Sequence, residues 1–143
     1  MDKKHIEFLT PELLSSEDPI WVNPVGGLGD ILMLSTALKR SFDKYSKKFH
    51  LARRSQYTEF FSQHPAIQEI GHPPIGSYIV CNDYWMREDF NNVNNKALDI
   101  TCKIFGIETC SNDELYLPEI RKNNATDLLI ENIPWRNKNV AIV

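Results

Sequence analysis

The chain has 143 residues, of which 42 % are hydrophobic and 24 % charged, a composition typical of a folded globular domain rather than a disordered segment. This length fits one domain, since domains cluster near ~100–150 residues. The 16 basic and 19 acidic side chains give a net charge of −3, so electrostatics favours neither nucleic acid nor an anionic membrane as a partner.

The pattern of apolar and turn-forming residues predicts alternating strands and helices. Residues 1–18 are expected to form an N-terminal arm or short helix, because Thr10-Pro11-Glu12 is a typical helix start. Residues 19–136 are expected to form the domain, and residues 137–143 either its last strand or the truncated start of a second domain. Short segments with bulky or branched residues predict strands at 20–25, 49–52, 67–70, 78–81 and 139–143. Helical periodicity predicts helices at 30–45, 56–63, 97–105 and 125–132, with an irregular loop at 82–95 and an extended segment at 115–118.

This alternation of strands and helices predicts the α/β class. Its expected architecture is a single domain with a Rossmann-like parallel sheet, covered by helices on both faces. Ligands of such sheets bind beyond the carboxyl ends of the strands, which directs attention to the segments that follow each strand.

A glycine-rich turn, Gly26-Gly27-Leu28-Gly29-Asp30, follows the strand at 20–25. Glycine permits positive φ and lets a ligand approach main-chain N–H groups closely. The next helix directs its unpaired N–H groups and the positive end of its dipole at the same place. We therefore predict that the ligand binds at this turn. Asp30 is expected to cap the helix, to accept a proton from the ligand, or to do both.

Two common nucleotide-binding motifs are absent from this turn. The dinucleotide fingerprint requires a third glycine where Leu32 stands, and a Walker loop requires a lysine that the turn lacks. The missing lysine excludes nucleotide hydrolysis at the turn.

The turn resembles a segment found in glycosyltransferases of the GT-B type, which are built from two facing Rossmann-like domains. Residues 29–39, Gly-Asp-Ile-Leu-Met-Leu-Ser-Thr-Ala-Leu-Lys, are similar to the Gly-Asp pair, apolar stretch, Thr-Thr-Pro-Ala-Leu and basic residue of the ADP-heptose:lipopolysaccharide heptosyltransferase family. Thr36 stands where that family usually has proline. Fainter similarity continues at 65–70, 98–107 and 115–118. Bacterial glycogen synthases share a Lys-x-Gly-Gly-Leu motif, but Pro24 replaces its lysine.

The resemblance implies that the chain is the N-terminal, acceptor-binding half of such an enzyme. The acceptor would be a glycan or lipopolysaccharide-type glycolipid, and the donor a nucleotide sugar bound mainly by the second domain. The implied reaction is inverting hexosyl or heptosyl transfer without metal or cofactor, with Asp30 as general base. Because residues 140–143 resemble the first strand of the family's second domain, the isolated chain is expected to be inactive.

The expected substrate-binding residues follow from the turn and from the rule on carboxyl ends of strands. Two other functions stay open: a binding module for a phosphorylated small molecule, and an interaction domain in which the glycines only form a tight turn. The predicted substrate-binding residues are Gly26, Gly27, Leu28, Gly29, Arg53, Asn82, Asp83 and Tyr84.

The remaining residues indicate the environment of the protein. Three cysteines without CxxC spacing and the lack of a recognisable secretory signal predict a cytoplasmic location. The four histidines lack metal-ligand spacing, so we expect no metal site. No apolar run approaches the ~20 residues of a membrane span, although peripheral contact with a membrane stays open. The sequence does not predict an oligomeric state.

Overall fold

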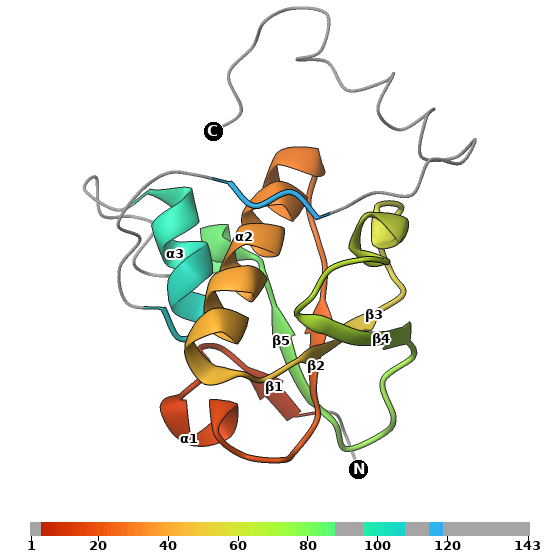
Figure 1. Cartoon of the computed structure of the whole chain (residues 1–143), viewed down its shortest axis with the longest axis vertical. Coiled ribbons are helices and arrows are strands. Elements are labelled where there is room, and N and C mark those ends of the chain that lie inside the picture. Colours follow the sequence, from red (N-terminus) through yellow and green to blue (C-terminus); the bar gives the residue numbers. More distant parts are fainter. Residues whose placement is uncertain (1–3, 88–95, 108–114, 119–143) are drawn as a thin grey trace, which may run out of the picture.

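The computed structural model describes residues 4–87, 96–107 and 115–118 (Figure 1). The helix predicted at 125–132, the strand at 139–143 and loop residues 88–95 lie outside these ranges. In chain order the elements are β1 (Lys4–Ile6), α1 (Pro11–Leu14), β2 (Ile20–Asn23), α2 (Leu28–Tyr45), β3 (Phe49–Ala52), the 3-10 helix η1 (Thr58–Phe61), β4 (Ile67–Gly71), β5 (Tyr78–Cys81), the 3-10 helix η2 (Tyr84–Met86) and α3 (Ala97–Ile104).

The five strands form one parallel sheet in the order β1-β5-β2-β3-β4. Strands β2, β3 and β4 follow one another toward one edge, whereas β5 lies on the other side of β2. If β2, β3, β4 and β5 are counted as strands 1 to 4, their order across the sheet is 3-2-1-4, which is that of a Rossmann-like sheet. Strand β1 is added beside β5. The predicted fold class, a Rossmann-like α/β domain, is therefore confirmed.

One face of the sheet carries the main hydrophobic core. Alternate strand residues such as Ile20, Val22 and Leu51 point to this face and are completely buried. Helices α2 and α3 pack on it and contact each other, and the ring of Phe105, just after α3, lies 5.8 Å from that of Phe49. The largest fully buried side chains are Phe49, Phe61, Phe105, Leu14, Ile20, Ile31, Leu32, Leu34, Leu38, Leu51, Ile100 and Ile104.

The opposite face differs from the prediction that helices cover both sides. Trp21, His50 and Ile79 lie on this face, and the ring of Trp21 lies 5.0 Å from that of His50. In the described part of the chain, the loop at 72–77 lies beside Trp21 and Ile79 on this face, whereas α2 and α3 lie on the other face (Figure 1). The connection from β4 to β5 contains two prolines and only six residues, which leaves no room for a helix.

Three local differences from the predicted elements have simple causes. The expected N-terminal arm contributes β1, whose three residues are too few for a recognisable pattern. The expected helix at 56–63 is the single turn η1, because Ser55 accepts hydrogen bonds from Tyr57 and Thr58 and so favours a turn. Helix α2 begins two residues earlier than predicted, since Gly27 acts as its N-cap.

Buried hydroxyl groups on α2 hold the segment at 115–118 against the helix. The Ser35 hydroxyl donates to the carbonyl of Tyr116 over 3.0 Å, and the N–H of Tyr116 donates to the Thr36 hydroxyl over 2.9 Å. Figure 1 shows this segment, in blue, running across α2. These contacts explain why α2 buries the hydroxyl groups of Ser35 and Thr36.

His64 is a buried neutral histidine that joins this region to β4. Its Nδ1 accepts the N–H of Ala66 over 3.1 Å, so its Nε2–H donates to the carbonyl of Ser35 over 2.9 Å. Burial lowers the pKa of His64 from 6.5 to about 4. The hydrogen bond from Ala66 requires the neutral ring, because a protonated Nδ1 cannot accept, whereas Nε2–H donates to Ser35 in either protonation state.

We expect His64 to make the fold sensitive to acid. The unfolded chain binds a proton on His64 near pH 6.5, whereas the folded chain does so only near pH 4, so stability falls as the pH decreases through this window. The loss of unfolding free energy reaches at most roughly 3 kcal/mol.

Urea unfolding of the wild type and of His64→Asn, measured between about pH 7 and about pH 4.5, checks this prediction. The variant should be less stable at neutral pH but should lose less stability on acidification. An equal loss in both proteins would contradict the role of His64.

Candidate functional site

The candidate site lies where β2 and β5 end side by side. Asn23, the last residue of β2, pairs in register with Cys81, the last residue of β5. The chain leaves β2 toward β3 on one side, whereas β5 lies on the other side, so this is the topological switch point of the sheet. Two segments meet here: the glycine-rich turn after β2 and residues 82–87 after β5.

The glycine-rich turn folds around the side chain of Asp30. The Oδ2 atom of Asp30 accepts the N–H of Gly27 over 3.0 Å, so the third residue of α2 caps the start of its own helix. Gly26 has a φ of +93°, and a Cβ atom at this position would lie 2.3 Å from the same Oδ2. Glycine is therefore required at position 26 by both the backbone conformation and the carboxylate.

Tyr84 approaches the same carboxylate from the segment after β5. Partial burial, together with a hydrogen bond to Asp30 and its negative charge, raises the pKa of the Tyr84 hydroxyl. A tyrosine hydroxyl is protonated at neutral pH, so Tyr84 interacts with the Asp30 carboxylate as a donor. Asp30 itself is half-buried, while Gly26 and Gly27 are exposed, so the carboxylate faces a surface that solvent reaches.

Asn82 fixes the turn relative to the sheet. Its side chain is fully buried and pairs with the backbone of Val25 in both directions, since Oδ1 accepts the Val25 N–H over 2.8 Å and Nδ2 donates to the Val25 carbonyl over 3.1 Å. The predicted substrate ligand Asn82 thus holds the turn in place, and both ends of its amide are occupied. Its part in the site is to position the turn.

Arg87 connects the segment after β5 to the segment after β1. Its guanidinium donates to the Asp83 carboxylate over 2.7 Å, to the Glu7 carbonyl over 2.9 Å and to the Cys81 carbonyl over 3.2 Å. It also lies over the ring of Phe8, 5.4 Å from the centroid. The side chain of Arg87 is 7 % exposed and that of Asp83 27 %, so this is a partly buried ion pair whose guanidinium is held by several hydrogen bonds. No local sequence pattern marks Arg87, because its partners lie up to 80 positions away.

The structure therefore brings together most of the predicted site residues and separates one of them. Gly26, Gly27 and Tyr84 lie around the carboxylate of Asp30, and Leu28 and Gly29 belong to the first turn of α2. Asp83 lies nearby but is engaged by Arg87. Arg53 follows β3, one strand further along the sheet, and its guanidinium pairs with Glu59 over 3.2 Å.

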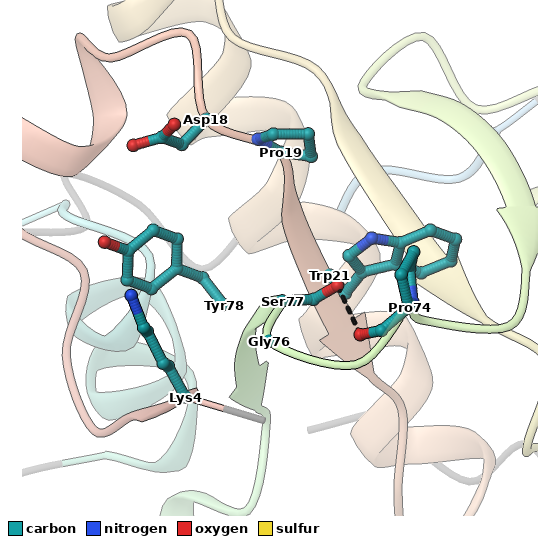
Figure 2. A pocket seen from close by; sticks show the side chains of 8 residues that line it. All are labelled: Lys4, Asp18, Pro19, Trp21, Pro74, Gly76, Ser77 and Tyr78. Atoms are coloured by element: carbon teal, nitrogen blue, oxygen red, sulfur yellow. Dashed lines mark hydrogen bonds between the residues drawn. The ribbon is translucent and has the colours of Figure 1, made fainter. Parts of the chain in front are cut away.

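A cavity of about 410 Å³ lies at the opposite edge of the sheet, where β1, β2 and β5 begin (Figure 2). Lys4 lies over the ring of Tyr78 at 5.0 Å, Asp18 lines the same cavity, and the Ser77 hydroxyl donates to the Pro74 carbonyl over 2.7 Å. None of the predicted site residues lines this cavity. The candidate site is therefore the switch point, where polar groups from the turn after β2 and from the segment after β5 lie close together.

The described ranges contain neither a candidate metal site nor a candidate membrane span. No group of three or more His, Cys, Asp or Glu side chains is arranged there to hold a metal ion. Likewise, none of the helices in those ranges combines the length and hydropathy of a membrane span.

Comparison of the chain with protein-family models, with curated proteins and with solved structures found no match. The function is therefore argued from the geometry of the site.

The strict requirement for glycine at position 26 gives a direct test of the turn. Gly26→Ala is expected to destabilise the protein by about 1–2 kcal/mol or more, since a left-handed non-glycine residue costs this much and its methyl group displaces Asp30. The matched control is Gly29→Ala, where an added Cβ meets no atom within 4 Å and the helix gains about 0.5–1 kcal/mol.

Thermal and urea unfolding of the two variants measures this difference. In a Gly26→Ala protein that also carries Asp30→Ala, the part of the loss caused by contact with the carboxylate should disappear. Equal effects of alanine at positions 26 and 29 would contradict the described turn.

Proposed function

We propose that the chain is the acceptor-binding half of a glycosyltransferase and that Asp30 is its general base. The observation that carries this proposal is the carboxylate of Asp30 at the switch point, which accepts the Gly27 N–H over 3.0 Å and interacts with the Tyr84 hydroxyl. A general base must lie where a substrate hydroxyl reaches it, and the half-buried carboxylate beside exposed glycines meets that condition.

In this mechanism the acceptor is a glycan or lipopolysaccharide-type glycolipid. Its hydroxyl donates a hydrogen bond to a carboxylate lone pair of Asp30 that Gly27 and Tyr84 leave open. The hydroxyl oxygen forms a bond to the anomeric carbon of a nucleotide sugar, the bond from that carbon to the diphosphate breaks, and Asp30 takes the proton. The configuration at the anomeric carbon inverts. The donor is bound by a second domain, and the reaction takes place in the cytoplasm.

Each protein group has a separate task in this scheme. The Gly27 N–H and the Tyr84 hydroxyl orient the carboxylate and hold it in one rotamer before substrate arrives. Asn82 and Arg87 keep the two segments that carry these groups at a fixed separation. General-base help of this kind contributes typically ~10²–10⁴-fold to the rate.

A binding module for a phosphorylated small molecule has less support at this turn. An anion at a helix N-terminus needs free N–H groups and a positive field. Here the Asp30 carboxylate already takes the Gly27 N–H and adds a negative charge in front of the helix. A neutral hydroxyl suits this environment better than a phosphate.

The test uses Asp30→Asn, in which the amide oxygen still accepts the Gly27 N–H while the basic carboxylate is lost. In the polypeptide that also contains the donor-binding domain, this variant should lower the rate of sugar transfer to lipopolysaccharide core glycans roughly 10²–10⁴-fold. Acceptor binding, measured by saturation-transfer NMR on this chain, should change little.

Tyr84→Phe serves as the comparison because it removes only the hydroxyl that orients the carboxylate, and we expect a smaller fall in rate. An unchanged rate in Asp30→Asn would remove Asp30 from catalysis. Binding of inorganic phosphate that strengthens in Asp30→Asn, with no transfer by the wild type, would favour the phosphate-binding module.

A further inference from the structure

A second cavity lies on the helix-free face of the sheet, apart from the turn that holds Asp30. Its volume is about 220 Å³, and its walls come from four strands or strand ends and the loops beside them. This volume is below the ~300–1,000 Å³ of pockets for drug-sized ligands, so it suits a smaller molecule. The lining residues are His5, Asn23, Ala52, Arg54, Pro73 and Ile79.

The polar groups of this cavity favour an anion. Arg54 and His5 supply a guanidinium and an imidazole from two separate segments, and no carboxylate is among the lining residues. Within the described residues, the Arg54 side chain makes no ion pair, whereas the neighbouring Arg53 is paired with Glu59. A planar guanidinium with free donors binds carboxylate and phosphate oxygens well.

Asn23 adds a second requirement for the ligand. Its Oδ1 atom is buried and has no hydrogen-bond partner in the described structure. A buried acceptor without a partner is costly, so such atoms call for an explanation. When the Asn23 side chain rotates toward the cavity, a ligand with a hydroxyl group beside its anionic group would donate to this oxygen.

We infer that this cavity binds a small hydroxylated oxyanion, such as a hydroxycarboxylate or a short phosphate monoester, through Arg54, His5 and Asn23. Arg54 contacts the anionic oxygens, His5 contributes a further donor, and Asn23 accepts from the neighbouring hydroxyl. The site does not depend on Asp30 or on glycosyl transfer.

Arg54→Gln and Arg53→Gln form a matched pair, since only Arg54 lines the cavity. Binding of lactate, glycerol 1-phosphate and inorganic phosphate at millimolar concentration is followed by NMR chemical-shift changes of the residues that line the cavity. We expect Arg54→Gln to weaken binding about tenfold or more, and Arg53→Gln to change it about twofold or less.

Lactate and propionate test the role of Asn23, because they differ in the hydroxyl group alone. The wild type should bind lactate more tightly than propionate, and Asn23→Ala should lose this preference. The stability of Asn23→Ala, measured by urea unfolding, should be unchanged or higher, because the unpartnered oxygen is removed. If Asn23 had a purely structural role, Asn23→Ala would instead lower the stability of the protein and leave its preference for lactate over propionate unchanged.

The outcomes separate the sources of binding. Preference for glycerol 1-phosphate over lactate identifies a phosphate ester site, and the reverse identifies a carboxylate site. The inference is overturned if no probe shifts the residues that line the cavity, or if Arg53→Gln and Arg54→Gln weaken binding equally. Asp30→Asn should leave binding unchanged, so failure here is distinct from failure of the proposed transferase function.

Discussion

The hydrogen bond from the Gly27 N–H to the Asp30 carboxylate is the contact on which the site depends. It allows α2 to begin directly after the turn, without a capping side chain from outside the helix. It also fixes the carboxylate at the carboxyl end of β2, where Rossmann-like sheets bind ligands. Gly26 makes this possible, since a side chain in its place would occupy the position of the carboxylate.

A second set of contacts determines where this turn lies relative to β5. The Asn82 amide pairs with both backbone groups of Val25, and the Arg87 guanidinium holds the chain between Cys81 and Asp83 against Glu7. These groups are buried and hydrogen-bonded, so each contact would be costly to break. The turn and the segment after β5 therefore form a rigid frame, which a base needs if it is to meet a substrate in one geometry.

The sequence predicts the parts of this structure that local patterns determine. A continuous apolar run located β5, short segments containing bulky or branched residues located β2, β3 and β4, and helical periodicity located α2 and α3. The turn and Asp30 were recognisable because glycines next to a helix start have a direct physical meaning.

The remaining features depend on contacts between distant residues, so local patterns do not reveal them. Strand β1 has three residues and forms because β5 offers an unpaired edge. Arg87 gains its role from Glu7 and Asp83, and the cavity beside Arg54 exists because the short loop at 72–77 passes over the sheet. The sequence placed Arg53 rather than Arg54 among the site residues, and only the conformation after β3 distinguishes these neighbours.

The most direct test of this account is the NMR coupling across the hydrogen bond, between the Gly27 nitrogen and the carboxylate carbon of the Asp30 side chain. The account predicts a measurable coupling, similar to that between the Ile31 nitrogen and the Gly27 carbonyl carbon in the same helix turn. If the Ile31 coupling is observed and the Asp30 coupling is not, the carboxylate is not held at the turn, and the proposed site loses its basis.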